Sequence, residues 1–197
     1  MKEKRYSVTR GNGILEGYLS RQRAQKADGL ILSDMRKGRI LDIGCGKEPY
    51  FLQNVEFHEK YGVDPQVKRS SRCKGIHIVK SNRLFLPFPD DFFDVVVMLA
   101  VIEHLSLDAV AVQVSEVHRV LRKGGRFIIT TPAKWTSGLL SVLSSAGLVS
   151  REEIDEHKKQ YSQTELHSVL RHGGFHGQNI RTGSFELFMN TWAFADK

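Results

Sequence analysis

The sequence predicts a single α/β domain, with helices on both faces of a mostly parallel sheet that ends in an antiparallel hairpin. Its 197 residues, 41% hydrophobic and 26% charged, suit one globular domain. Short apolar runs alternate with helical stretches over residues 40–130, which is typical of parallel strands joined by helices. The last two runs lie too close together for a crossover helix, so we expect them to pair antiparallel.

The first half of the chain supplies most of the strands. Residues 1–17 are polar and contain glycine, which predicts a flexible arm. Residues 19–35 carry apolar side chains at roughly helical spacing, which predicts an amphipathic helix beside the sheet. Apolar runs then predict five strands, at residues 40–43, 61–63, 76–79, 94–98 and 127–130.

Two more helices and the hairpin complete the prediction. One helix covers residues 108–122 and is expected to stop at Gly124-Gly125. The pattern Ser162-Gln163-Thr164-Glu165 is a capping box that begins another helix, which Gly173-Gly174 closes. Residues 178–181 and 186–195 form the hairpin, with a turn at Thr182-Gly183-Ser184. Residues 134–160 are expected to form a lid over the site or an insertion that closes the core.

Composition limits the function classes. The net charge is +7, but residues 1–40 alone contribute +6, so the basic excess is local and typical of a solvated helix face. Cys45 and Cys73 have neither disulfide-framework nor zinc spacing, so no metal site is expected. No signal peptide is visible and no apolar run is long enough to span a bilayer, which favours a cytoplasmic protein.

The strongest local motif is an apolar strand that runs into Gly44-Cys45-Gly46. Glycine lets a ligand approach the backbone, whose N–H groups can face an anion. A dinucleotide fingerprint would place glycine or alanine at residue 49, where this chain has Pro49. Asp42, two residues before the first glycine, suits a cofactor with an ammonium group better than one with two phosphates.

A second acid follows the next predicted strand. Asp64 ends the run Tyr61-Gly62-Val63-Asp64, 18 residues after Gly46. A carboxylate at the tip of this strand can accept hydrogen bonds from both ribose hydroxyls of an adenosine.

These motifs belong to an ordered series. Leu41-Asp42-Ile43-Gly44-Cys45-Gly46, Gly62-Val63-Asp64, residues 86–96 from Leu-Pro-Phe-Pro onward, Ile102-Glu103-His104-Leu105 and Val120 to Gly125 follow one another along the chain. The series resembles that of class I S-adenosylmethionine-dependent methyltransferases, and most closely the methyltransferase type 11 family. The resemblance covers residues 37–132, and more loosely the remainder.

The resemblance implies a Rossmann-like, seven-stranded sheet and S-adenosylmethionine as cofactor, with S-adenosylhomocysteine as product. It implies that Gly44, Cys45 and Gly46 line the methionine part of the cofactor. It also implies that Asp42 lies near the cofactor's amino group and that Asp64 holds the ribose.

The resemblance further implies an adenine contact at residue 82. The family usually has Asp there, and Asn82 can accept the same hydrogen bond without charge. Arg83 and Ala100 complete the expected set of cofactor-binding residues.

Methyl transfer mainly requires that two reactants be positioned and water excluded. Where the acceptor needs a base, histidine is the usual choice. His104 at the carboxyl edge of the sheet and His157 in the 134–160 segment are the candidates, although His104 could instead hydrogen-bond loop backbone only.

We expect a small-molecule acceptor and no nucleic acid. An RNA methyltransferase is the first alternative, motivated by the basic arm; against it, the chain has Ala100 to His104 where base-amine enzymes carry Asn or Asp before Pro-Pro and an aromatic residue. A non-catalytic adaptor with this fold is the second alternative, which the intact glycine loop disfavours.

Overall fold

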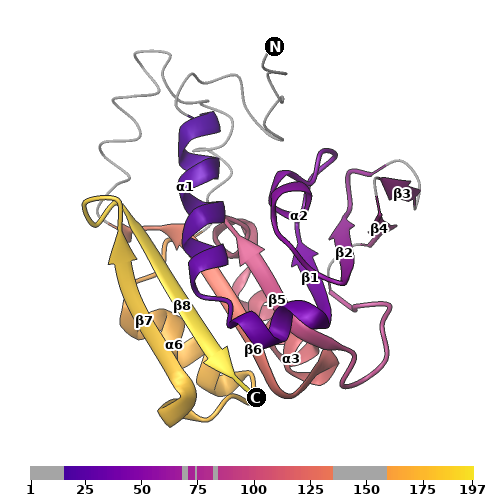
Figure 1. Cartoon of the computed structure of the whole chain (residues 1–197). Helices are drawn as coiled ribbons and strands as arrows, with labels where there is room; N and C mark the ends of the chain where they lie inside the picture. Colours follow the sequence, from indigo (N-terminus) through magenta and orange to yellow (C-terminus); the bar gives the residue numbers. More distant parts are fainter. Residues whose placement is uncertain (1–15, 68–70, 74, 82–83, 135–158) are drawn as a thin grey trace.

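The computed structural model describes residues 16–67, 71–73, 75–81, 84–134 and 159–197 (Figure 1). Within these ranges one sheet has the strand order β3-β4-β2-β1-β5-β6-β8-β7. The five strands from β4 to β6 in this order pair in parallel, and β8 is antiparallel to β6 and β7. The bounds are β1 (Arg39–Ile43), β2 (Glu59–Asp64), β3 (Ser71–Cys73), β4 (Ile76–Lys80), β5 (Phe93–Leu99), β6 (Leu121–Pro132), β7 (Ile180–Phe185) and β8 (Asn190–Asp196).

The predicted seven-stranded, mostly parallel sheet with a terminal antiparallel hairpin is confirmed. The three-residue β3, antiparallel to β4, adds an eighth strand at the edge of the sheet. The predicted lid over residues 134–160 and the predicted arm over residues 1–17 lie almost wholly outside the described residues.

Helices cover both faces of the sheet (Figure 1). α3 (Leu107–Val120) and α6 (Gln163–His172) lie on one face, and α1 (Glu16–Gly29) and the short α2 (Tyr50–Asn54) on the other. Side chains along β1 alternate between the two cores, since Leu41 packs in the core under α3 and Ile40 in the core under α1. Burial on both faces explains why the parallel strands are nearly continuous apolar runs.

The first helix is shorter than the sequence predicts. α1 ends at Gly29 and a separate 3-10 helix, η1 (Ser33–Lys37), precedes β1, so the prediction of one helix over residues 19–35 is wrong at its C-terminal end. Glycine has a low helix propensity. In addition, the Arg126 guanidinium donates a hydrogen bond of 2.7 Å to the Leu30 carbonyl and thereby draws this carbonyl away from helical pairing.

The predicted stop of α3 at Gly124-Gly125 is also wrong. α3 ends at Val120 and β6 begins at the next residue, so both glycines lie inside the strand. The pairing of β5 with β6 shifts register between Phe93 and Val95, and the surplus residues of β6 bulge. Gly124 has a φ of +73°, which a residue with a side chain rarely adopts.

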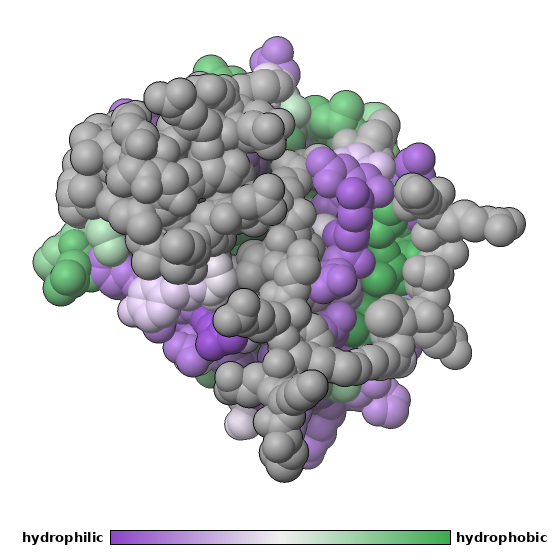
Figure 2. Space-filling view, turned by 90° about the horizontal axis from the view of Figure 1, so that it is seen from above, coloured by the Kyte–Doolittle hydropathy of each residue, from purple (hydrophilic) through white to green (hydrophobic). Residues whose placement is uncertain are grey.

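The hairpin exists, but its turn is not at Thr182-Gly183-Ser184. β7 runs straight through these residues, and the turn follows at residues 186–189. Gly183 is needed because the Trp192 ring packs against it: a Cβ at residue 183 would lie 2.6 Å from Cζ2 of Trp192. The turn exposes Leu187 and Phe188, and Figure 2 shows hydrophobic surface on the side where Figure 1 places the hairpin.

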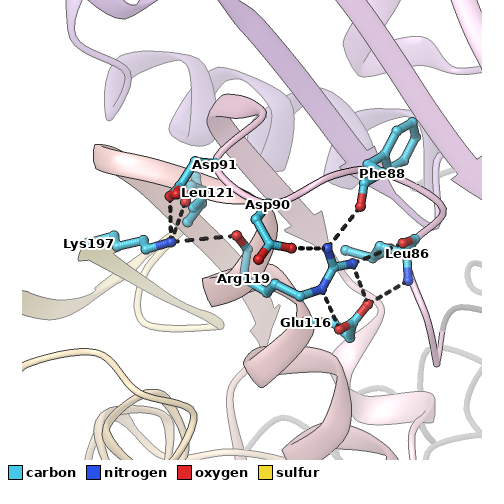
Figure 3. Close-up of polar contacts among 8 residues, drawn as sticks. All are labelled: Leu86, Phe88, Asp90, Asp91, Glu116, Arg119, Leu121 and Lys197. Atoms are coloured by element: carbon cyan, nitrogen blue, oxygen red, sulfur yellow. Dashed lines mark hydrogen bonds and ion pairs between the residues drawn. The ribbon is translucent and has the colours of Figure 1, made fainter.

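Hydrogen bonds and an ion pair hold the loop from β4 to β5 against α3 (Figure 3). The Arg119 guanidinium donates to the carbonyl oxygens of Leu86 at 3.1 Å and Phe88 at 2.9 Å, and it pairs with Asp90 at 2.7 Å. Glu116 accepts from Arg119 and from the Leu86 N–H at 2.9 Å. These bonds satisfy buried loop backbone and fix the path along which β5 enters the sheet.

No helix among the described residues is long and apolar enough to cross a membrane. The same residues contain no group of His, Cys, Asp and Glu side chains arranged to hold a metal ion.

The predicted capping box at the start of α6 is confirmed, and it allows a test of the fold. Ser162 Oγ accepts from the Glu165 N–H at 3.2 Å, and the Glu165 carboxylate accepts from the Ser162 N–H at 2.9 Å. We expect Ser162→Ala to lower the free energy of unfolding by about 1 kcal/mol in urea denaturation, because it removes the cap. The control Ser168→Ala, exposed on the same helix, should change it much less; equal effects would contradict a specific role of the cap.

Candidate functional site

The carboxyl ends of β1, β2 and β5 meet at one edge of the sheet, around the glycine turn. Gly44 and Gly46 have φ values of +80° and +70°, so the turn needs residues without side chains. A Cβ on Gly44 would lie 2.5 Å from Cγ2 of Val101, which follows β5. The Gly44 N–H donates to the Val63 carbonyl of β2 at 2.8 Å. The turn is therefore tied to both neighbouring strands.

Asp64 is the last residue of β2, and only 1% of it is exposed. Its Oδ2 accepts a hydrogen bond from the Gly46 N–H at 3.1 Å, and its Oδ1 accepts from the Gln66 N–H at 2.7 Å. The carboxylate thus joins the glycine turn to the loop after β2. Each of its oxygens can accept a further bond, so a pair of hydroxyls could also bind there.

Asp42 is buried in β1 on the neighbouring strand, paired opposite Gly62. Burial, and then the nearby charge of Asp64, raise the pKa of the Asp42 carboxyl to about 7. A cationic group bound beside these two acids would relieve their repulsion and favour ionised Asp42. Together the acids form a site for a ligand that carries positive charge.

Cys45 lies between the two glycines and is buried. Burial and the charges of Asp42 and Asp64 raise the pKa of its thiol, so the thiol stays neutral and is a poor nucleophile. Its Sγ would lie 2.7 Å from a Cβ on Gly62, so the glycine in β2 makes room for it. Cys45 is therefore suited to packing.

Ala100 follows β5 at the same edge and has a φ of +53°, unusual for a residue with a side chain. Its N–H donates to the Thr130 carbonyl at 2.9 Å, which holds it in this conformation. Backbone strain of this kind often marks a functional site. The sequence-predicted Asn82, Arg83 and His157 lie outside the described residues.

His104 and Glu103 belong to the 3-10 helix η2 (Ile102–His104) after β5. His104 is half-buried, and its N–H donates to the Val101 carbonyl at 3.1 Å. Glu103, which the sequence analysis did not select, is buried, with 1% exposed. Burial raises the pKa of its carboxyl to about 7, although the Arg23 charge and a 3.1 Å bond from Thr131 Oγ1 act in the opposite direction. Its position beside His104 at the sheet edge was the signal available in the sequence.

Comparisons with known proteins bear on the family and the fold of this chain. Residues 41–129 match a family model described as a methyltransferase domain. A mouse (Mus musculus) protein named "Probable tRNA methyltransferase 9B" is 34% identical over 104 residues, which cover 50% of this chain and 23% of that protein. This chain therefore spans about a quarter of that relative.

Solved structures share the fold. One is a Thermotoga maritima S-adenosylmethionine-dependent methyltransferase described as a possible histamine N-methyltransferase, with a TM-score of 0.68 and 17% identity over 89% of this chain and 87% of that chain. Another is a Haloferax volcanii methyltransferase in complex with the Trm112 methyltransferase activator, with a TM-score of 0.67 and 14% identity over 92% and 95% of the two chains. At these identities the likeness concerns the fold.

The raised pKa of Asp42 predicts how stability depends on pH. The folded state holds a proton that the unfolded chain has lost above about pH 4, so this group makes stability fall as pH rises toward 7. Asp42→Asn should flatten this fall and stabilise the ligand-free protein by on the order of 2 kcal/mol at pH 8, measured by thermal unfolding from pH 5 to 8.

The control for this measurement is Glu56→Gln, which changes an exposed carboxylate after α2 and should follow the wild-type profile. The raised pKa of Glu103 also makes stability fall as pH rises. Asp42→Asn should therefore reduce the slope of stability against pH without abolishing it. A variant that is less stable than wild type at pH 8 would contradict the buried-acid account.

Proposed function

We propose that this chain is a class I S-adenosylmethionine-dependent methyltransferase and that it transfers the methyl group of that cofactor to a nitrogen or oxygen acceptor. The observation that carries the proposal is the buried acid pair Asp42 and Asp64 at the positive-φ glycine turn. The cofactor supplies an activated methyl group on a sulfonium, which leaves the protein to bind, orient and exclude water.

The residues of the turn fit this cofactor. Asp64 would accept from the ribose hydroxyls through the lone pairs that its two backbone bonds leave unused. Gly44 and Gly46 would let the methionine part approach the backbone, with Cys45 beside it and Asp42 near the ammonium group. At the same edge, Ala100 would contribute backbone. Asn82 would accept from the adenine amine, and Arg83 would also bind the cofactor.

A nicotinamide dinucleotide fits less well. The helix after the turn, α2, has only five residues and begins behind Pro49, so it offers little helix terminus to a pyrophosphate. The buried Asp42 carboxyl would lie near two phosphates, and like charges there would oppose binding. A non-catalytic adaptor would not need this acid pair.

For the acceptor we favour a small molecule. The polar side chains around Glu103 are buried inside the fold, which suits a compact acceptor. His104 at the same edge, and His157, remain candidate bases. tRNA is the second candidate, because of the 34% identity to the mouse protein named for tRNA and the basic excess in residues 1–40.

Calorimetric titration with S-adenosylmethionine, S-adenosylhomocysteine and NADH tests the proposal. We expect both sulfur compounds to bind and NADH not to bind. Asp64→Ala should weaken S-adenosylhomocysteine binding at least tenfold, since it removes a charged acceptor of hydrogen bonds from the ribose and from the turn itself. Asp34→Ala, an exposed acid on η1, is the control and should bind as wild type does. Failure of both sulfur compounds to bind would favour the adaptor.

A further inference from the structure

Five elements bring polar side chains together beyond the carboxyl ends of β5 and β6. We call this set the edge cluster: Arg23 of α1, Glu103 of η2, Thr131 of β6, Tyr161 before α6, and Glu186 in the β7–β8 turn. Figure 2 views this end of the molecule from above. No two members are closer than 25 positions in the sequence, so only the fold assembles them.

The contacts within the edge cluster centre on Glu103. Thr131 Oγ1 donates to Glu103 Oε2 at 3.1 Å, and the Lys159 N–H donates to the Glu103 carbonyl at 3.3 Å. Burial raises the pKa of both Glu103 and Glu186, and the charge of Arg23 opposes this rise at both acids. Burial, and then the charges of Glu103 and Glu165, raise the pKa of the Tyr161 phenol.

Several buried atoms in and beside the edge cluster lack hydrogen-bond partners among the described residues. They include Glu103 Oε1 and Tyr161 Oη, both on side chains that are at least 99% buried. Arg23 Nε and Glu186 Oε1 are also buried and lack a hydrogen-bond partner among the described residues. A buried polar atom without a partner destabilises a dry interior, so a group of them points to a polar ligand or to water.

The edge cluster also lies close in the chain to the proposed cofactor site. Val101 packs on Gly44 of the glycine turn, and Glu103 is two residues further along the same segment. A group held at Glu103 would therefore stand beside the end of β5, where ligands of open α/β sheets bind.

We propose that the edge cluster binds the methyl acceptor and that Glu103 Oε1 takes the proton of its reacting N–H or O–H group. This inference rests on the methyltransferase function proposed above. A lone pair of the acceptor forms the new N–C or O–C bond to the methyl carbon while the C–S bond breaks. The electron pair of that bond stays on sulfur, which becomes a neutral thioether, and the acceptor's proton passes to the carboxylate. Tyr161 and Arg23 orient the acceptor.

Burial of Glu103, opposed by the charge and hydrogen bonds around it, sets the working pH. Arg23 faces it from α1 and the Tyr161 phenol from the segment before α6, while Thr131 binds it from β6. With a carboxyl pKa of about 7, Glu103 is ionised in a rising fraction of molecules between pH 6 and 8. The transfer rate should therefore rise over this range and then level off.

The test compares wild type with Glu103→Gln, which keeps the shape and loses the base. Tritiated-methyl S-adenosylmethionine is offered with two acceptor pools, the small-molecule fraction of a cell extract and purified tRNA. We expect methylation in one pool, a fall of about 100-fold or more in Glu103→Gln, and loss of the rise in rate between pH 6 and 8. The affinity for S-adenosylhomocysteine should stay within about threefold, and Glu56→Gln should behave as wild type does.

A second variant tests the role of Glu103 without replacing that residue, so the result does not depend on whether Glu103→Gln folds. Thr131→Val removes the hydrogen bond that lowers the Glu103 pKa, so it should move the rise in rate to higher pH. The pool that is methylated identifies whether the acceptor is a metabolite or a tRNA nucleoside.

Three results would overturn the inference: full transfer with a wild-type pH profile in Glu103→Gln, parallel loss of cofactor binding and transfer in that variant, or no transfer to either pool by wild type that binds S-adenosylhomocysteine. Failure of wild type to bind S-adenosylhomocysteine would instead remove the proposed function on which the inference rests.

Discussion

Burial of two carboxylates on adjacent strands is the constraint around which the rest of the site is arranged. Asp42 lies opposite Gly62 in the β1–β2 pair, and Asp64 follows two residues further along β2. Both are almost fully buried, and the charge of Asp64 disfavours ionisation of Asp42. Asp64 is stabilised by two backbone N–H groups, one of them from the glycine turn. Asp42 is the acid that a cationic ligand would stabilise most.

The parallel sheet brings the other residues of the site next to these two carboxylates. The strand order places β1 between β2 and β5, so their carboxyl ends lie side by side. Val101 closes on the glycine turn from β5, and the Ala100 N–H ties that segment to β6. Beyond it, Glu103 is held by Thr131 near the end of β6. A chain of direct contacts therefore runs from the acid pair to the edge cluster.

The sequence predicts the frame well, because burial on both faces makes each parallel strand a continuous apolar run. Its predictions are wrong where contacts between distant residues determine where a helix ends or a turn forms. The turn was expected at Gly183, but that glycine makes room for Trp192; the helix stop was expected at Gly124-Gly125, which serve a bulge. The sequence could identify Gly44, Gly46, Asp42 and Asp64 as candidate site residues because they belong to local motifs. For Glu103 the sequence offered only its position beside His104, because its partners Arg23 and Tyr161 are distant in sequence.

Asp42 should ionise when the ammonium group of the cofactor or of its product binds beside it, and the linkage of protons to binding measures this directly. The enthalpy of S-adenosylhomocysteine binding at pH 7 should be determined in buffers with different enthalpies of ionisation. With a carboxyl pKa of about 7 in the free protein, the account predicts release of about half a proton, and much less in Asp42→Asn. An enthalpy that is independent of the buffer, or equal proton release by wild type and Asp42→Asn, would contradict it.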